Sequence, residues 1–271
     1  MIKQTTSNID PVNETDLGNA LRLVERHGQD IRYVAQWKTW LTWNGQFWTI
    51  DHKGDIYEKA KDTALSIYDE AERKHRGDIF RYQELREHAK SSESKSRIEA
   101  MVKLAQSDPR VVVEPVELDR DPWLFNVENG TVDLRTDQLR GHCQEDLITK
   151  VAPVSYDPTA KCPLWDQFLD TITDGNEELI TFLQRAIGYS AIGLSNEQHL
   201  FFLYGAGANG KSTFIELIAE ILGEYAQKAP ASMLKKKRGS WIPSEVARLK
   251  GARFVTACEL SEGMELDEGW S

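Results

Sequence analysis

The chain has 271 residues, 40% of them hydrophobic, and a formal net charge of −10 at pH 7. This composition predicts a folded protein and excludes an intrinsically disordered one, and the length fits one to three domains. The negative charge excludes a protein that is basic over its whole surface, so binding to nucleic acid would require a local basic patch.

The cysteines and the apolar runs exclude further classes. Cys143, Cys162 and Cys258 are far apart and odd in number, and no C-x-x-C pair occurs, so neither a zinc site nor a disulfide framework is indicated. The N-terminus has no apolar signal core, and no apolar run approaches the roughly 20 residues of a membrane span. We therefore expect a soluble, cytoplasmic protein with no membrane contact.

The first predicted element is an amphipathic helix that begins at Asp16, as its cap, and ends at Gly28. Residues 37–50 then place β-prone segments on either side of Asn44-Gly45, which is a strong hairpin signal. The tryptophans of this segment fit the core of a small sheet, which is the interpretation we favour, or a base-stacking platform.

The highly charged segment from Ile56 to Gln106 has a helical pattern, and breaks at Gly77 and near Ser91 predict two or three helices. A short strand is predicted at residues 111–113.

A second hairpin is predicted at Asn129-Gly130. Beyond a turn-rich linker, two amphipathic helices are predicted over residues 165–172 and 177–192.

Residues 205–212 fit G-x-x-x-x-G-K-[ST], the pattern of a phosphate-binding P-loop. The apolar run Leu200–Tyr204 predicts a buried strand before this loop, and apolar residues at helical spacing from Phe214 to Ile221 predict a helix after it. Glycines let backbone N–H groups turn onto phosphates, and a helix N-terminus adds partial positive charge. The alternative is a glycine turn that happens to end in Lys-Ser.

Within the loop, Lys211 would reach the β- and γ-phosphates and the Ser212 hydroxyl would bind Mg²⁺. The residues expected to contact the nucleotide are Gly205, Ala206, Gly207, Ala208, Asn209, Gly210, Lys211, Ser212 and Thr213.

Phosphoryl transfer also needs a carboxylate at the tip of a neighbouring strand. The β-prone run Phe254–Glu259 ends in such a group, so Glu259 is the candidate and Glu262 the backup. The alternatives are an ordinary acidic residue at a strand end for Glu259 and a solvated turn for Glu262.

Two other charged segments are weaker signals. The basic run Lys235–Arg238 fits contact with DNA phosphates or a solvated loop. Asp119 and Asp121 have the spacing of a polymerase-type metal pair, but Arg120 lies between them and Pro122 follows, so we disfavour a primase site there.

Residues 205–213 resemble the P-loop of superfamily 3 helicases, in particular the primase–helicase proteins of phages, plasmids and poxviruses. Leu118–Leu134 is similar to the family segment "LDxDPWLLNxxNGTxDL", and Ala247–Glu259 resembles the approach to its Walker B strand. Shorter likenesses occur at residues 15–20, 165–169 and 183–189.

The resemblance implies an ATP-dependent, ring-forming DNA helicase that replicates a phage, prophage or plasmid and acts on single-stranded or forked DNA. The ring is hexameric in the intact family, with ATP between neighbouring subunits. It implies ATP and Mg²⁺ as ligands, Lys211 and Glu259 as catalytic residues, and Ser212 and Glu259 at the metal. The family continues past Walker B with a sensor, a DNA-contacting hairpin and an arginine finger. This chain ends at Ser271, so we expect an incomplete helicase domain that binds nucleotide weakly and turns over little.

The predicted fold class is an α+β N-terminal region followed by a partial, AAA+-like α/β P-loop domain. The expected division is a polar tail at 1–15, an α+β domain at 16–160, a helical linker at 161–195 and the partial P-loop domain at 196–271. The favoured function is the N-terminal portion of a replicative DNA helicase. The alternatives are a non-catalytic DNA- or partner-binding module with a vestigial P-loop and, less favoured, a small-molecule P-loop kinase.

Overall fold

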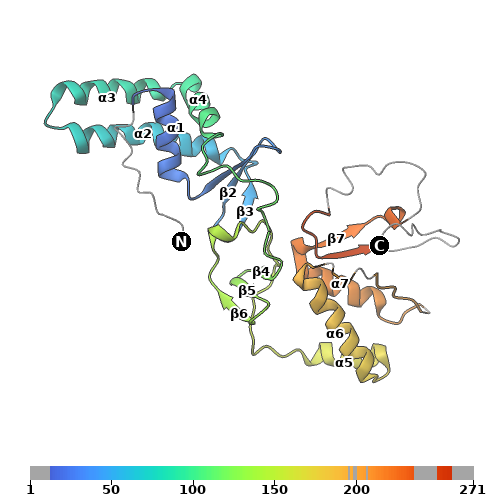
Figure 1. The fold of residues 1–271 in the computed structure, drawn as a ribbon. Coiled ribbons are helices and arrows are strands. Elements are labelled where there is room, and N and C mark those ends of the chain that lie inside the picture. Colours follow the sequence, from blue (N-terminus) through green and yellow to red (C-terminus); the bar gives the residue numbers. More distant parts are fainter. Residues whose placement is uncertain (1–12, 195, 198–199, 206, 235–248, 258–271) are drawn as a thin grey trace. The chain divides into compact units, whose positions relative to one another are not determined.

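The computed structural model describes residues 13–194, 196–197, 200–205, 207–234 and 249–257. The chain forms two compact units, unit 1 (Met1–Leu118) and unit 2 (Asp119–Ser271) (Figure 1). This division falls inside the region that the sequence predicts as one α+β domain. The reason is that the second β-hairpin packs its valines with apolar residues of the predicted linker helices and the P-loop helix, in one core.

Residues 13–118 of unit 1 form a three-stranded antiparallel sheet in the order β1-β2-β3 and four helices. Its elements are α1 (Asp16–His27), β1 (Ile31–Val34), β2 (Thr39–Trp43), β3 (Trp48–Ile50), α2 (Asp55–His75), α3 (Ile79–Ser92) and α4 (Lys95–Ala105). The hairpin at Asn44-Gly45 and the division of the charged segment into helices are confirmed.

Two local details of unit 1 differ from the sequence prediction. The cap of α1 is Thr15, one residue earlier than predicted, because its Oγ1 accepts a hydrogen bond of 3.0 Å from the Gly18 N–H. The predicted strand at residues 111–113 is a single bridge from Val112 to Tyr33 of β1. It extends no further toward Ile31 because the Val111 N–H, which a longer ladder would need, donates instead to the Asp108 carbonyl.

The core of unit 1 lies between the sheet and helices α1, α2 and α4. Trp40 and Trp48 are buried, Trp43 is half-buried and Trp37 is exposed. The Arg32 guanidinium lies 4.6 Å from the centroid of the Trp48 ring, a cation–π contact. The core interpretation is therefore confirmed for Trp40 and Trp48.

A buried polar network joins α1, α3 and α4. The His88 Nε2 lies 2.8 Å from Asn19 Oδ1, and the Asn19 amide donates to Ser92 Oγ at 2.9 Å. Arg97 Nη1 lies 3.4 Å from His88 Nδ1, which fits an imidazole that is neutral and accepts at this nitrogen. Burial, reinforced by the charges of Arg22 and Arg97, lowers the pKa of His88 to about 4.

The lowered pKa of His88 predicts acid sensitivity of unit 1. An unfolded histidine takes up a proton near pH 6.5, where the folded one does not, so the contribution of His88 is complete above that pH. We expect it to be lost between pH 6.5 and about 4, by up to about 3 kcal/mol. Urea titrations at pH 7, 5.5 and 4.5 measure the free energy of unfolding. In His88→Gln, this free energy should depend less on pH over the same range. An equally steep loss in His88→Gln would contradict this assignment.

The described residues of unit 2 form a three-stranded antiparallel sheet, a pair of parallel strands and three helices. Its elements are β4 (Leu124–Val127), β5 (Gly130–Asp133), β6 (Gln138–Arg140), α5 (Pro163–Thr173), α6 (Glu177–Ile192), α7 (Lys211–Leu222), β7 (Ala226–Ala229) and β8 (Phe254–Ala257). Short 3₁₀ turns occur at Gln144–Asp146, Gly223–Tyr225 and Ala231–Leu234. The second hairpin, both linker helices and the helix after the P-loop are confirmed.

The predicted buried strand before the P-loop is wrong. Residues 200–205 form no strand, and the side chains of Leu200–Tyr204 are exposed, Tyr204 by 91%. A strand needs a hydrogen-bonded neighbour, and within the described residues β8 pairs in parallel with β7 instead. Of α7, Phe214, Ile218 and Leu222 are buried, while Leu217 remains 37% exposed.

None of the helices in the described ranges is long and apolar enough to span a membrane.

Candidate functional site

The glycine-rich segment 205–210 leads directly into α7. Gly205 and Gly210 adopt φ angles of +146° and +82°, and Ala208 has a φ of +58°, so the loop repeatedly uses conformations that favour glycine. Ala206 lies outside the described residues. Gly207, Ala208 and Asn209 are exposed. The loop is therefore a surface turn at the N-terminal end of α7.

The Lys211 side chain closes this loop. Its Nζ donates to the Gly205 carbonyl oxygen at 3.1 Å and to Asn209 Oδ1 at 2.6 Å. Because Lys211 is the first residue of α7 and Gly205 begins the loop, these bonds hold the ammonium inside the turn. The structure thus places the Lys211 ammonium beside Gly205, the first glycine of the pattern.

Helix α5 fixes the end of the loop. A Cβ on Gly210 would lie 2.5 Å from Ile172 Cγ2 and 3.2 Å from Phe168 Cε2, so the close approach of α5 requires glycine there. One turn further along α7, the Phe214 ring stacks on the Trp165 ring with centroids 5.6 Å apart. These contacts hold α7, and the loop that precedes it, against α5.

The N-terminus of α7 is open to an anion. Gly210 caps the helix without a side chain, and the first turn carries no acidic residue. First-turn N–H groups and the helix dipole then favour a negatively charged ligand. Ser212 and Thr213 lie in this exposed first turn. The segment 207–213 therefore combines a lysine, an uncapped helix end and two hydroxyl groups.

The acidic partner of the loop is not placed. Strand β8 ends at Ala257, and both Glu259 and the backup Glu262 lie outside the described residues. The basic run Lys235–Arg238 does too. Within the described ranges, no group of three His, Cys, Asp or Glu residues could hold a metal ion.

The aspartates with metal-pair spacing are structural. Asp119 accepts hydrogen bonds from the Thr149 N–H, at 2.7 Å, and from its hydroxyl, at 2.5 Å. Asp121 binds the Arg135 guanidinium at 2.8 Å. Each carboxylate is thus committed to a neighbour in unit 2, which agrees with the interpretation against a primase site.

Sequence reasoning missed the role of Arg253, at the start of β8. Its guanidinium donates to the carbonyl oxygens of Ala191 and Leu124, each at 2.7 Å, and lies 4.5 Å from the Tyr225 ring centroid. Burial lowers the pKa of Arg253 and raises the pKa of Tyr225 to about 12. This residue joins α6, β4 and β8. The sequence gives no signal beyond an arginine before a β-prone run.

Residues 20–174 match the family described as D5 N terminal like. The match covers more than half of the chain, and the protein therefore belongs to the D5 N terminal like family. It extends from α1 through α5 and ends before the P-loop.

The chain is also similar to a protein of Acanthamoeba polyphaga mimivirus named "Putative helicase L207/L206". The two are 31% identical over 162 residues, which make up 56% of this chain and 16% of that protein. The chain thus spans only a small part of its relative.

Proposed function

We propose that this chain is part of a superfamily 3 replicative DNA helicase and that it binds ATP at residues 205–213. Membership of the D5 N terminal like family and the similarity to the mimivirus protein support a replication protein of this kind. In the whole protein, ATP hydrolysis would be coupled to DNA unwinding in a homo-oligomeric ring, a hexamer as the resemblance implies.

The observation that carries the nucleotide proposal is the position of the Lys211 ammonium. It lies inside the turn, where it donates to the Gly205 carbonyl and to the Asn209 side-chain oxygen. Phosphate oxygens are stronger acceptors for an ammonium than neutral carbonyls are. An anion at the uncapped end of α7 would therefore attract this side chain.

The remaining roles extend this arrangement. The Ser212 hydroxyl would hold Mg²⁺, which would neutralise charge on the phosphates, and Glu259 would act as the Walker B acid. Hydrolysis would proceed by in-line attack of a water on the γ-phosphate. Lys211 and an arginine from a neighbouring subunit would stabilise the developing charge.

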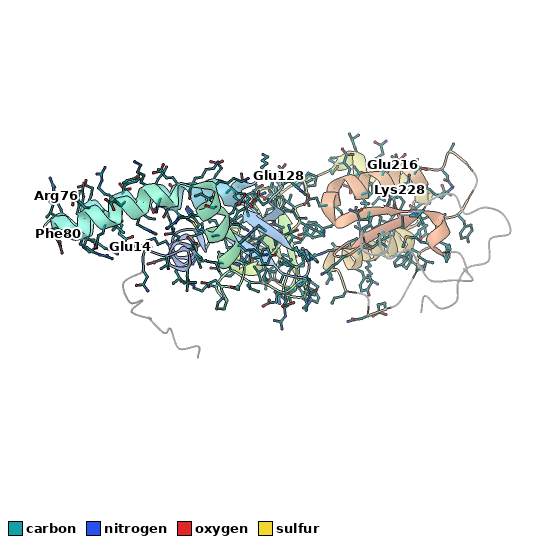
Figure 2. The ribbon with its side chains drawn as sticks, turned by 90° about the horizontal axis from the view of Figure 1, so that it is seen from above. Glu14, Arg76, Phe80, Glu128, Glu216 and Lys228 are labelled. Atoms are coloured by element: carbon teal, nitrogen blue, oxygen red, sulfur yellow. The ribbon has the colours of Figure 1, made fainter. Side chains whose placement is uncertain are left out.

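A nucleotide titration tests the proposal. In the full chain, Lys211→Ala should weaken binding of a fluorescent ATP analogue in the presence of Mg²⁺ by about 10- to 100-fold, because a charged hydrogen-bond donor to the phosphates is lost. Lys228→Ala is the matched control, since Lys228 is an exposed lysine of β7 in the same unit (Figure 2). Unchanged affinity in Lys211→Ala would refute the phosphate site.

One observation favours a second candidate, a non-catalytic DNA- or partner-binding module. The segment before the P-loop is exposed rather than part of a sheet, so the loop lacks the strand that normally anchors it. Steady-state ATPase measurements on the full chain separate the candidates. Turnover that depends on Lys211 supports the helicase, whereas salt-dependent DNA binding without turnover, unchanged in Lys211→Ala, supports the module.

The DNA-binding measurement should use the full chain. A shorter fragment that ends near Ile192, before the P-loop, is not suitable. Phe214, Ile218 and Tyr225 belong to the same core as Val127 of the hairpin, so a fragment would lose part of its own interior.

A further inference from the structure

The hairpin of α2 and α3 extends beyond its own hydrophobic core. Ala71 is the last fully buried residue of α2 and Leu85 the first of α3. Every residue from 72 to 84 is exposed or half-buried. We use the name "hairpin tip" for residues 73–81, and Figure 2 shows Arg76 and Phe80 together at this end of the hairpin.

The hairpin tip is locally basic in an acidic chain. It contains four arginine or lysine residues and one carboxylate, that of Asp78. Two of these cations are already engaged, because Lys74 pairs with Glu70, and Arg81 with Glu14 and Glu84. Within the part of the chain that the structure describes, Arg73 and Arg76 form no ion pair. Their charges are available to an external anion.

Two large apolar side chains lie beside these cations. Phe80 is 78% exposed and Ile79 is 66% exposed. Both residues lie in the first turn of α3. An exposed aromatic ring next to unpaired guanidinium groups is the combination that binds single-stranded nucleic acid, since the bases stack on the ring and the phosphates pair with the cations.

Side-chain contacts join the two helices of the hairpin next to its tip. Tyr82 donates a hydrogen bond to Glu72 at 2.6 Å, and Arg86 donates to the Tyr82 hydroxyl at 2.9 Å. The Arg86 guanidinium also lies 5.5 Å from the ring centroids of Tyr68 and Tyr82. The Tyr82–Glu72 hydrogen bond and the Arg86–Tyr68 contact join α3 to α2 just below the tip.

We propose that the hairpin tip is a binding site for single-stranded DNA, with Arg73 and Arg76 on phosphates and Phe80 stacked on a base. An acidic protein segment would satisfy the charges but would leave the Phe80 ring without a flat partner. The chain as a whole is acidic, so binding to DNA requires a local basic patch such as this one. This site lies in unit 1 and is independent of the proposed nucleotide site at Lys211.

The test measures binding of fluorescein-labelled dT20 to the full chain by anisotropy, at several salt concentrations. The double variant Arg73→Gln/Arg76→Gln should weaken binding about tenfold. It should also lower the slope of log Kd against log salt by about 1.4, which corresponds to the loss of two phosphate contacts on a single strand. The charge-matched control is Lys95→Gln/Lys103→Gln, which removes two exposed lysines from α4 of the same unit. It should leave the affinity within about twofold of the original chain.

The stacking contact is tested separately. Phe80→Ala should weaken dT20 binding by about tenfold or more without changing the salt slope, because a base–aromatic contact contributes about 1 to 3 kcal/mol. Leu164→Ala, at a residue 79% exposed in unit 2, is the control for loss of an exposed apolar side chain. An abasic oligonucleotide of the same length should bind the original chain with about the affinity that dT20 has for Phe80→Ala.

Three results would overturn the site: no binding of dT20 by the full chain, equal losses in the arginine and lysine double variants, or no loss in Phe80→Ala. Displacement of dT20 by polyglutamate at equal charge concentration would instead assign the hairpin tip to an acidic protein partner. The fluorescent ATP analogue should bind all tip variants normally, so failure here is distinguishable from failure of the nucleotide site.

Discussion

Replacing Phe214 by alanine should lower the free energy of unfolding of unit 2 by about 3 to 5 kcal/mol. The ring is buried and stacks on Trp165, and it belongs to the core that also contains Val127, Val132 and Leu169. Removing it deletes the stacking contact with Trp165 of α5 and leaves a cavity in this core. Because α7 begins with Lys211, the same change should also weaken nucleotide binding.

Hydrogen exchange followed by mass spectrometry is the suitable measurement, because it reports the two units separately. Peptides from α5 and α7 should lose protection in Phe214→Ala, while peptides from unit 1 should keep theirs. Leu217→Ala on the same helix is the control, since that side chain is 37% exposed and its loss should cost less than about 1.5 kcal/mol. Equal effects of the two substitutions would show that α7 does not pack as described.

The second large effect is expected at Arg253. In Arg253→Met, unit 2 should lose about 3 kcal/mol of stability, since two charged hydrogen bonds disappear and the Leu124 carbonyl is left buried without its partner. The contact of the guanidinium with the Tyr225 ring is lost as well. Chemical denaturation measures the loss of stability, and hydrogen exchange in peptides from β4 and α6 shows where it occurs.

Lys228→Met provides the comparison for Arg253→Met, because it removes one exposed positive charge from the neighbouring strand β7. Its effect should lie within about 0.5 kcal/mol of zero. If Arg253→Met is equally mild, then the two carbonyl bonds of the guanidinium do not hold β8 in place.

The elements that the sequence predicts well are those whose signals are local. Asn44-Gly45 and Asn129-Gly130 each define a hairpin because glycine, and asparagine before it, suit the turn whatever surrounds them. The bounds of α6 agree with the predicted helix because the side chain of Asn176 caps it and Gly193 ends it. The glycines and the lysine of the P-loop are likewise predicted from a short local pattern of residues.

Features that depend on distant partners could not be predicted. The apolar run at residues 200–204 has the composition of a buried strand, but a strand forms only where a neighbouring edge accepts its hydrogen bonds. The role of Arg253 depends on carbonyl groups 62 and 129 positions away. The division at Leu118 follows from which core each hairpin joins, and the sequence predicts the hairpins without predicting their packing.

The shared core of unit 2 determines where this chain tolerates recombination with its relatives. A chimera joined at Leu118 exchanges a complete interior on each side of the junction. A chimera joined at residue 195 would pair the hairpin and α5 of one parent with α7 of another, so Trp165 and Phe214 would come from different lineages. Productive exchanges should therefore cluster at the first junction, and the hairpin and the P-loop helix should be inherited together.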